Sequence, residues 1–365
     1  MGIKSLSKFL KDSFPNVFEN IHISDYRYKK VAIDITLYLC HFKVNLQERW
    51  ILGFLDLVKT FREHEIHTVF IFDSGYPPEK QEERKQRMLQ RAKTEEKVFN
   101  LEQAIEKYED SGEIDSILLD FQSKRGLTPL RMINNKSTSI NIAAIKYLVK
   151  KMRRQLFTIS REDYDLIKQL FTIMDVPYYY SPLEAETMCA DLCIQGKVDA
   201  VLTEDTDVLA YGSPVFLTNY KNGYCTRINS EYLFQEMGLT ADEFLDFCIM
   251  CGTDYNKNIY KVGPAKSYKY ILEHKSIDKL KTETNLDVTI LNHVRVRQLF
   301  REYERYQGKI PYCGFPDFEK LGILLVQKNI KMDLESIKDS FTSKIELDDD
   351  EEIIESDDLQ KQEDQ

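Results

Sequence analysis

Residues 181–212, SPLEAETMCADLCIQGKVDAVLTEDTDVLAYG, hold the pattern that decides the fold: an acidic helix followed by a short buried strand. Ser181 and Glu184 suit a helix start, because serine caps a helix, the proline after it fits the first turn, and an acid completes a capping box. We expect the helix to run to Gln195, since the glycine that follows can adopt the left-handed conformation that ends a helix. Its first turn would then carry two acids, Glu184 and Glu186.

Three short apolar runs of the chain each lead into acids. Residues 30–33 precede Asp34, residues 69–72 precede Asp73, and residues 200–202 lead into Asp205 and Asp207. Runs of this length can cross a sheet that is covered on both faces. Because the carboxyl ends of parallel strands meet at one edge of a sheet, we expect these acids to lie together, with Glu184 and Glu186 beside them. The sequence therefore predicts an α/β protein with a mostly parallel central sheet and helices on both faces.

A cluster of like charges of this kind is unstable unless cations lie among its oxygens. Hard divalent ions such as Mg²⁺ or Mn²⁺ prefer an all-oxygen environment. Two such ions about 3.5–4 Å apart form a centre that cleaves phosphodiesters. The acids therefore predict a two-metal nuclease, with Asp205 as a central catalytic residue.

The net charge of −10 is unevenly distributed along the chain. Residues 346–365 hold eleven acids and one lysine, so the remaining residues sum to zero. Residues 80–155 hold seventeen Lys and Arg against eleven Asp and Glu. A basic segment beside an acidic metal site is typical of a protein that acts on nucleic acid. The acidic tail, residues 341–365, is predicted to be disordered.

The seven cysteines are scattered, which is typical of reduced thiols inside a cell. Cys248 and Cys251 form a CxxC pair, but they lie on an apolar helical face, which favours buried thiols over a zinc site. No apolar run reaches the roughly 18 residues of a membrane span. Lys4, Lys8 and Lys11 interrupt the start of the chain, so we expect no signal peptide and an intracellular protein.

A long charged helix is predicted after the turn at Pro77-Pro78. It spans about residues 79–110 and has few apolar residues in its first half. Four cations spaced by four, three and four residues share one of its faces: Lys80, Arg84, Arg87 and Arg91. A solvated surface is the alternative. Because the helix leaves directly from a strand that ends in an acid, we expect these cations to face substrate phosphates.

The remaining elements are predicted from hydrophobic periodicity. We expect helices at 2–11, 35–64, 141–154, 161–174 and 240–251, a strand at 176–180, short strands and turns over 215–233, a loop or arch over 111–140, and mixed helix and loop over 276–340. No role is assigned to the last of these segments.

The turn at Gly263 opens a helix that carries Lys266 and Lys269. With the helix at 240–251 it resembles a pair of helices that grips a phosphate backbone through exposed amides and a helix N-terminus. A plain helical packing unit is the alternative.

These motifs resemble those of the flap endonucleases and their relatives, the XPG/Rad2 superfamily of 5′ nucleases. MGIKSLSKFL at the start is similar to the family's opening, KVAID to its first acidic motif, and VFIFDSGYPP to its second. Residues 181–214 look like its most distinctive block. FCIMCGTDY and VGPAKSYKYI look like its last acidic motif and its helix–two-turn–helix. The order holds over roughly residues 1–280.

The resemblance implies a PIN-like 5′-nuclease core over residues 1–280. That core would contain a helical arch at about 76–155 and a helix–two-turn–helix at about 240–275. A C-terminal helical and loop extension would follow over 281–340, and then the acidic tail.

The resemblance also implies the site residues. The metal ligands would be Asp34, Asp73, Glu184, Glu186, Asp205, Asp207 and Asp254. Lys80 and Arg87 would touch the scissile phosphate, Gly2 would lie near the duplex junction, and a K⁺ ion would bind near Gly263. Two Mg²⁺ ions, for which Mn²⁺ can substitute, would support cleavage of DNA near single-strand/duplex junctions, such as a 5′ flap, in replication, repair or recombination.

The chain departs from the family pattern in a few places. Lys261 stands where the family usually has a glycine, and Cys40 stands where it has a base-stacking tyrosine, with Tyr38 nearby. The tail lacks the family's sliding-clamp motif. A virus-encoded member fits these departures. We expect a monomer without membrane contact that works in the nucleus or at another site of DNA replication, a virus factory if the member is viral.

Other interpretations fit less well. A haloacid-dehalogenase phosphatase expects Thr or Val where Leu209 follows the DTD motif. Within the family, a 5′→3′ exonuclease, a bubble or junction cutter and an RNA-directed exonuclease are not distinguished by sequence. A catalytically silent DNA-binding scaffold is a different class, which a missing acid would have favoured.

Overall fold

A seven-stranded sheet forms the centre of the computed structural model, which describes residues 2–127, 140–330 and 332–342. Its strand order is β1-β7-β6-β5-β2-β3-β4. The strands are β1 (Glu19–His22), β2 (Lys30–Asp34), β3 (His67–Phe72), β4 (Tyr178–Tyr180), β5 (Ala200–Leu202), β6 (Val215–Lys221) and β7 (Tyr224–Asn229). The strands from β6 to β4 run parallel, whereas β7 is antiparallel to β6 and β1 is antiparallel to β7. The predicted mostly parallel α/β sheet is confirmed.

The register of the central strands places their carboxyl ends side by side. Strand β2 lies between β3 and β5, with Asp34 opposite Ile71 and Ile33 opposite Leu202. Acids that follow these strands therefore start from the same edge of the sheet.

Alternate residues of the strands point into two separate cores, which explains why the runs are apolar throughout. Ala32 and Val201 belong to one core, and Ile33 and Leu202 belong to the other. The first core is covered by α1 (Leu6–Ser13), α8 (Ala185–Ile194), α9 (Asp207–Tyr211), α10 (Ser230–Met237) and α11 (Ala241–Cys251). The second is covered by α2 (Ile35–Leu46), α3 (Ile51–Glu63), α7 (Arg161–Ile173), α15 (Phe318–Gln327) and α16 (Leu334–Thr342).

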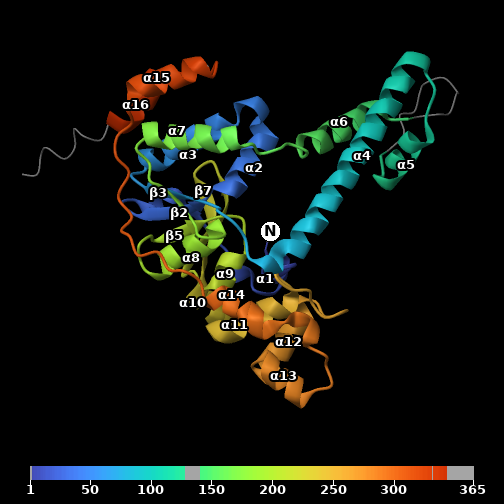
Figure 1. The fold of residues 1–365 in the computed structure, drawn as a ribbon, viewed down its shortest axis with the longest axis vertical. Helices are drawn as coiled ribbons and strands as arrows, with labels where there is room; N and C mark the ends of the chain where they lie inside the picture. The colour runs from blue at the N-terminus through green and yellow to red at the C-terminus, as the bar shows by residue number, and fades with distance from the viewer. Residues whose placement is uncertain (1, 128–139, 331, 343–365) are drawn as a thin grey trace, which may run out of the picture.

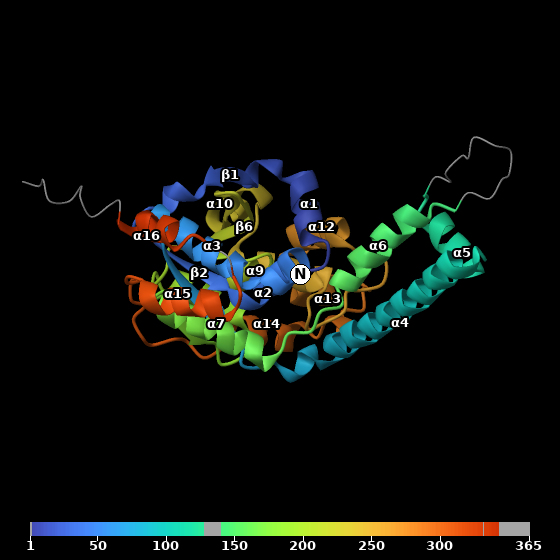
Figure 2. The ribbon, with the colours of Figure 1, turned by 90° about the horizontal axis from the view of Figure 1, so that it is seen from above.

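Three helices project from this body and form the arch, which we define as α4 (Gln81–Ser111), α5 (Ser116–Lys124) and α6 (Ile142–Arg154). Helix α4 has 31 residues, which corresponds to about 46 Å. Figure 1 shows α4 running away from the sheet, and Figure 2 shows α6 alongside it. The far end has a small core of its own, which includes Leu101, Phe121 and Ile145. The first half of α4 buries no side chain.

A second group of helices lies below the start of α4 in Figure 1. It consists of α11, α12 (Pro264–His274), α13 (Ile277–Glu283) and α14 (His293–Arg301). We call α11 to α13 the two-turn module. In the segment between α11 and α12, Lys261 has a φ of 61°, a left-handed conformation that favours glycine.

Several element boundaries differ from those predicted. The helix expected at 35–64 is divided into α2 and α3, because Gln47 adopts a φ of 52° that no helix can continue. The helix expected at 2–11 begins only at Leu6. Strand β1 and the short helices α9 and α10 were not predicted.

Parts of two predicted segments lie outside the described residues: 128–139 of the arch loop and 343–365 of the acidic tail. The proposed domain boundaries stay a prediction. Within the described part of the chain, no helix combines the length and apolar character of a membrane span.

Candidate metal centre

Two acids at neighbouring strand ends are linked by one threonine. Asp34 ends β2 and is buried, and its Oδ1 accepts a hydrogen bond from the Thr36 amide at 3.0 Å, so it also caps α2. The Thr36 hydroxyl donates to Oδ2 of Asp73 at 2.5 Å. Oδ1 of Asp73 accepts from the Ala185 amide at 2.7 Å, which ties this strand end to the start of α8. Thr36 was not singled out in the sequence, because a threonine after an acid carries no signal of its own.

The start of α8 differs from the prediction. The helix begins at Ala185, and Glu184 occupies the N-cap position without a side-chain capping bond. The Ser181 hydroxyl donates to the Glu184 carbonyl at 2.7 Å, and the amides of Ser74 and Gly75 donate to the Leu183 carbonyl. These contacts hold residues 181–184 outside the helix. The Glu184 side chain is therefore free to turn toward other groups of the site.

Three buried acids converge in the middle of the site. Glu186, Asp205 and Asp207 each offer a carboxylate oxygen, and these oxygens lie within 4.8 Å of one another. The Asp207 amide donates to Oδ1 of Asp205 at 3.0 Å. Asp207 is fully buried, and neither of its side-chain oxygens has a hydrogen-bond partner. Two unpartnered carboxylate oxygens in a buried position are costly unless a cation or proton satisfies them.

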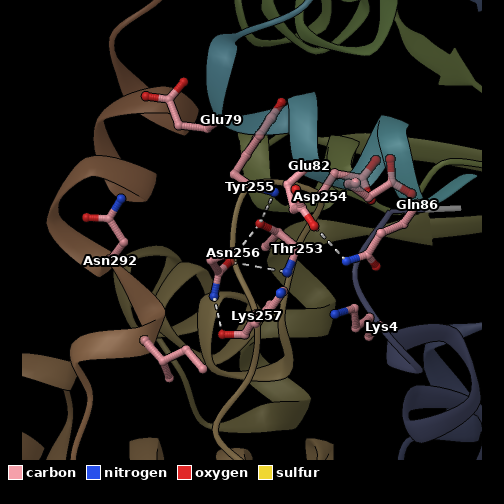
Figure 3. A pocket seen from close by; sticks show the side chains of 12 residues that line it. Lys4, Glu79, Glu82, Gln86, Thr253, Asp254, Tyr255, Asn256, Lys257 and Asn292 are labelled. Atoms are coloured by element: carbon pink, nitrogen blue, oxygen red, sulfur yellow. Dashed lines mark hydrogen bonds between the residues drawn. The ribbon is translucent and has the colours of Figure 1, made fainter.

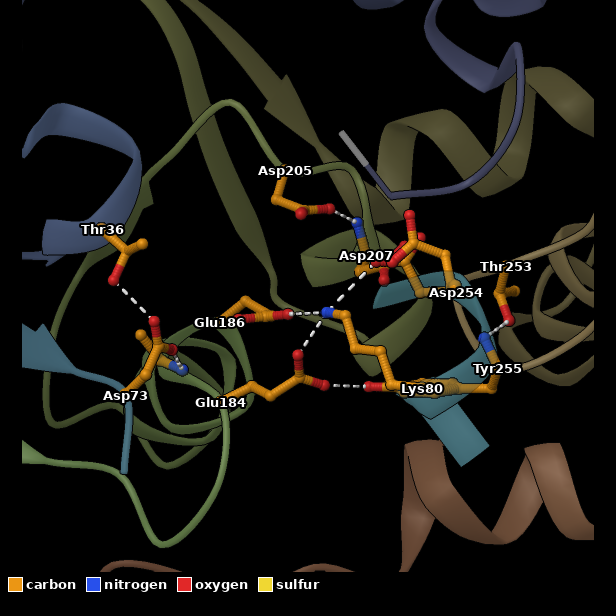
Figure 4. A network of polar contacts seen from close by, with 12 residues as sticks. Thr36, Asp73, Lys80, Glu184, Glu186, Asp205, Asp207, Thr253, Asp254 and Tyr255 are labelled. Carbon is orange, nitrogen blue, oxygen red and sulfur yellow. Dashed lines mark hydrogen bonds and ion pairs between the residues drawn. The ribbon is translucent and has the colours of Figure 1, made fainter. Parts of the chain in front are cut away.

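Lys80 reaches into this group of acids from the segment that precedes α4, as Figure 4 shows. Its side chain is 9% exposed. The ammonium forms ion pairs with Glu184, with Asp254 at 3.1 Å and with Glu186 at 3.7 Å. The Tyr255 hydroxyl donates to the other oxygen of Glu184 at 2.7 Å, a contact that the sequence did not indicate. Lys80 thus joins the two acids at the start of α8 to Asp254, which lies some 70 residues further along the chain.

The other three cations predicted on this face lie on α4, and each has a different neighbour. Nη2 of Arg87 donates to Oδ2 of Asp254 at 2.9 Å. The Arg84 guanidinium lies 3.9 Å from the centre of the Tyr76 ring. Arg91 donates to the carbonyls of Leu156 and Phe157 at 3.1 and 2.5 Å, and so connects the arch to the segment that follows α6.

Burial dominates the electrostatics of the acids. It raises the pKa of Asp34 to about 8, and neighbouring carboxylates add to the effect. It also raises the pKa values of Glu186 and Asp207 well above their usual range, with a further contribution from Asp205. Burial alone would lower the pKa of Lys80, but the surrounding carboxylates raise it above its ordinary value. The acids therefore attract positive charge strongly, and Lys80 supplies part of it.

The donor set fits divalent cations. We call Asp34, Asp73, Glu184, Glu186, Asp205, Asp207 and Asp254 the acid cluster. Its side-chain donors are all carboxylate oxygens, which Mg²⁺ and Mn²⁺ prefer. The unpartnered oxygens of Asp207 and the converging oxygens of Glu186 and Asp205 are the observations that support a cation here.

Gly2 lies against the same acids. Its φ is 83°, and a Cβ placed on it would overlap Oδ1 of Asp205 and lie 2.6 Å from Oδ1 of Asp207. The Ile3 amide donates to the Thr206 hydroxyl at 3.2 Å and fixes this end of the chain. A side chain at position 2 would therefore displace the carboxylates.

The predicted DNA-binding residues of the two-turn module lie on its surface. Gly263 occupies the N-cap position of α12, and its carbonyl accepts from the Lys266 amide at 3.0 Å. Lys266 and Lys269 are exposed. The contact of this group with DNA stays a prediction.

A pocket of about 220 Å³ separates the start of α4 from the two-turn module and α14. Figure 3 shows Glu79 and Asn292 at its left, with Glu82, Asp254, Asn256 and Lys257 to their right. The arch and the two-turn module therefore meet beside the acid cluster, with Asp254 shared between the pocket and the ion pairs of Lys80.

Comparison with known proteins identifies the family. The XPG N-terminal domain model matches residues 1–94, and the XPG I-region model matches residues 175–254. A probable RAD2-like endonuclease of invertebrate iridescent virus 6 is 31% identical, with 93% of this chain and 92% of that protein covered. Flap endonuclease 1 of Xenopus tropicalis is 27% identical, with 83% and 75% covered. The catalytic core of Rad2 in complex with DNA substrate shares the fold, with a TM-score of 0.64, 18% identity and coverage of 93% and 98%. The chain therefore belongs to the XPG/Rad2 family of nucleases.

Proposed function

We propose that this protein is a divalent-metal-dependent 5′ nuclease that hydrolyses DNA phosphodiesters near single-strand/duplex junctions, a 5′ flap above all. The observation that carries the proposal is the convergence of Glu186, Asp205 and Asp207, each of which offers one oxygen within 4.8 Å of the other two. In addition, neither oxygen of the buried Asp207 has a hydrogen-bond partner. The relatives named as endonucleases support the reaction class.

The acid cluster would hold two Mg²⁺ ions, and Mn²⁺ could substitute for them. The chemistry that such a pair of ions supplies is Lewis-acid activation of the attacking water and neutralisation of the leaving oxygen. Asp205 is central in this proposal, because its Oδ1 accepts the Asp207 amide and so fixes two ligands relative to each other.

Lys80 and Arg87 would stabilise the transition state. Both cations already lie at Asp254, at 3.1 and 2.9 Å. When a phosphate enters, each can exchange a carboxylate for a phosphate oxygen with a small movement of its side chain. Fixed positive charge beside the reacting phosphate lowers the barrier, because negative charge accumulates there in the transition state.

The DNA contacts follow the positions of exposed groups. Arg84 and Arg91 on the arch and Lys266 and Lys269 on α12 would bind phosphates, and the turn at Gly263 would bind the backbone with a K⁺ ion. Gly2 would lie near the duplex junction. We also propose a core over residues 1–280, an extension over 281–340 and an acidic tail, in a monomer that works in the nucleus or a virus factory.

A cleavage assay tests the proposal. Flap, gapped, bubble, four-way junction and RNA substrates are incubated with Mg²⁺ or with EDTA. We expect cleavage with Mg²⁺ only and preference for the 5′ flap. Preference for another substrate would support an exonuclease or junction-cutting relative, and the absence of cleavage on every substrate would favour a DNA-binding scaffold.

The Asp205→Ala variant tests the site itself. It should lower the cleavage rate by at least about three orders of magnitude, as loss of a charge-stabilising group does, and leave DNA binding largely intact. Asp199→Asn is the matched control, because Asp199 lies at the opposite end of β5 and accepts the Lys30 amide. Retained turnover in Asp205→Ala would remove the metal assignment.

A further inference from the structure

Helix α14 lies in the segment to which the sequence assigned no role, and it connects the turn that precedes α4 to the two-turn module. Its basic side chains each meet an acid from another part of the chain. The pairs are His293 with Asp278, Arg295 with Glu79, Arg297 with Asp246 and Asp278, and Arg301 with Asp242. The partners belong to α11, to α13 and to the turn Pro78–Lys80 that precedes α4.

Arg297 joins α14 firmly to the two-turn module. Its Nε and Nη2 donate to the two oxygens of Asp246, both at 2.6 Å, and its Nη1 donates to Asp278 at 2.6 Å. Asp246 is 3% exposed and also accepts the Ile277 amide at 2.9 Å. A bidentate contact between an arginine and a buried carboxylate fixes the orientation of the two side chains as well as the distance between them. Helix α14 therefore moves with α11 and α13.

Arg295 extends from the same helix to the turn that precedes α4. Its Nε donates to Oε1 of Glu79 at 2.7 Å, although the two residues lie 216 positions apart. The Arg295 guanidinium lowers the pKa of Glu79. The other oxygen, Oε2, is buried without a hydrogen-bond partner. The hydrogen bond from Arg295 therefore fixes the position of the Glu79 carboxylate.

Glu79 and Lys80 belong to one short turn. Residues Pro78–Lys80 form a 3-10 helix, and the Lys80 amide donates to the Pro77 carbonyl at 3.1 Å. A shift of Glu79 therefore shifts the backbone from which the Lys80 side chain reaches the acid cluster. Figure 3 shows Glu79 on the same side of the pocket as Asn292, the residue that precedes α14.

We propose that Arg295 is a positioning residue for Lys80, and that α14 transmits the position of the two-turn module to the reaction centre. The proposal rests on the proposed function. With duplex DNA bound at the module, α14 would hold Glu79, and so Lys80, at the reacting phosphate. Arg301 has no such role, because its pair with Asp242 is exposed and neither residue touches the arch.

The experiment measures single-turnover cleavage of a 5′ flap at saturating enzyme, together with the DNA dissociation constant. Arg295→Ala should lower the rate about tenfold, because small displacements of a catalytic group cost up to about 10²-fold. The dissociation constant and the melting temperature should stay unchanged. Arg301→Ala, the matched control on the same helix, should cleave at the wild-type rate.

Two further variants separate positioning from general damage. In a Lys80→Met background, Arg295→Ala should have no further effect, since the residue it positions is gone. The charge exchange Glu79→Arg/Arg295→Glu should recover most of the rate. A wild-type rate in Arg295→Ala, or a tenfold loss that persists in the Lys80→Met background, would overturn the inference and leave the nuclease function standing. Failure of the wild type to cleave any substrate would overturn both.

Discussion

The acid cluster and the arch face each other, but the chain holds them by different means. Asp34 and Asp205 are buried at the edge of the sheet, and their carboxylates accept hydrogen bonds from the backbone amides of Thr36 and Asp207. The first half of α4 buries no side chain and is joined to the body by polar contacts, such as those of Arg87 and Arg91. Substitutions in the acid cluster should therefore act on the reaction itself, and substitutions along the arch should act mainly on binding. Lys80 is the point where the two regions meet.

The largest effect is expected at Lys80. Lys80→Met should slow single-turnover cleavage by about two to three orders of magnitude, because the variant keeps the length of the side chain but removes a charge beside the phosphate. DNA affinity should change little. Lys85→Ala is the control, since Lys85 is an exposed lysine one turn further along α4. A loss confined to binding would place Lys80 with the arch rather than with the acid cluster.

An intermediate effect is expected from pH in the absence of metal. The pKa of Asp34 is raised from 3.8 to about 8, so between about pH 4 and pH 8 the folded protein holds a proton that the unfolded chain has lost. The free energy of unfolding should therefore fall as pH rises through this window. Each 1 kcal/mol of lost stability lowers the melting temperature by about 2–4 °C. Mg²⁺ should reduce the loss, because the cation replaces the proton.

Thermal unfolding with EDTA and with Mg²⁺, followed between pH 5 and pH 8, measures this effect. Asp34→Asn should flatten the dependence in EDTA. A melting temperature in EDTA that rises toward pH 8 would contradict the assignment of raised pKa values to the acid cluster.

The smallest effect is expected at Arg84, which stacks on the Tyr76 ring and does not reach the acids. Arg84→Ala should weaken DNA binding about two- to fivefold and leave the single-turnover rate unchanged. The slope of the logarithm of the binding constant against the logarithm of the salt concentration should decrease in magnitude by about one. Arg161→Ala, an exposed arginine on α7, is the control. A large loss of rate in Arg84→Ala would show that the arch takes part in the chemistry well beyond Lys80.

The sequence predicted the features that depend on local pattern. The apolar runs that end at Asp34, Asp73 and Asp205 identified the sheet and its acidic edge, because a buried strand has to be apolar on both faces. The charged composition of residues 79–110 identified α4 for a similar reason, since a helix with few apolar residues cannot lie in a core.

Features that depend on distant contacts could not be predicted. Ser181 looks like a helix cap, but its hydroxyl donates to the Glu184 carbonyl, in a segment also held by the amides of Ser74 and Gly75. Helical spacing placed Lys80, Arg84, Arg87 and Arg91 on one face, yet only Lys80 and Arg87 share a partner, Asp254. The pair of Arg295 and Glu79 joins residues 216 positions apart, and no periodicity indicates it.

The close approach of Gly2 to Asp205 and Asp207 has a consequence for comparing genomes. Because any side chain at position 2 would collide with the carboxylates, this position should tolerate no replacement in copies of the gene that still encode an active enzyme. A gene copy in which this codon has changed should encode an inactive protein even when all seven acids are intact. A search for the acids alone would count that copy as functional.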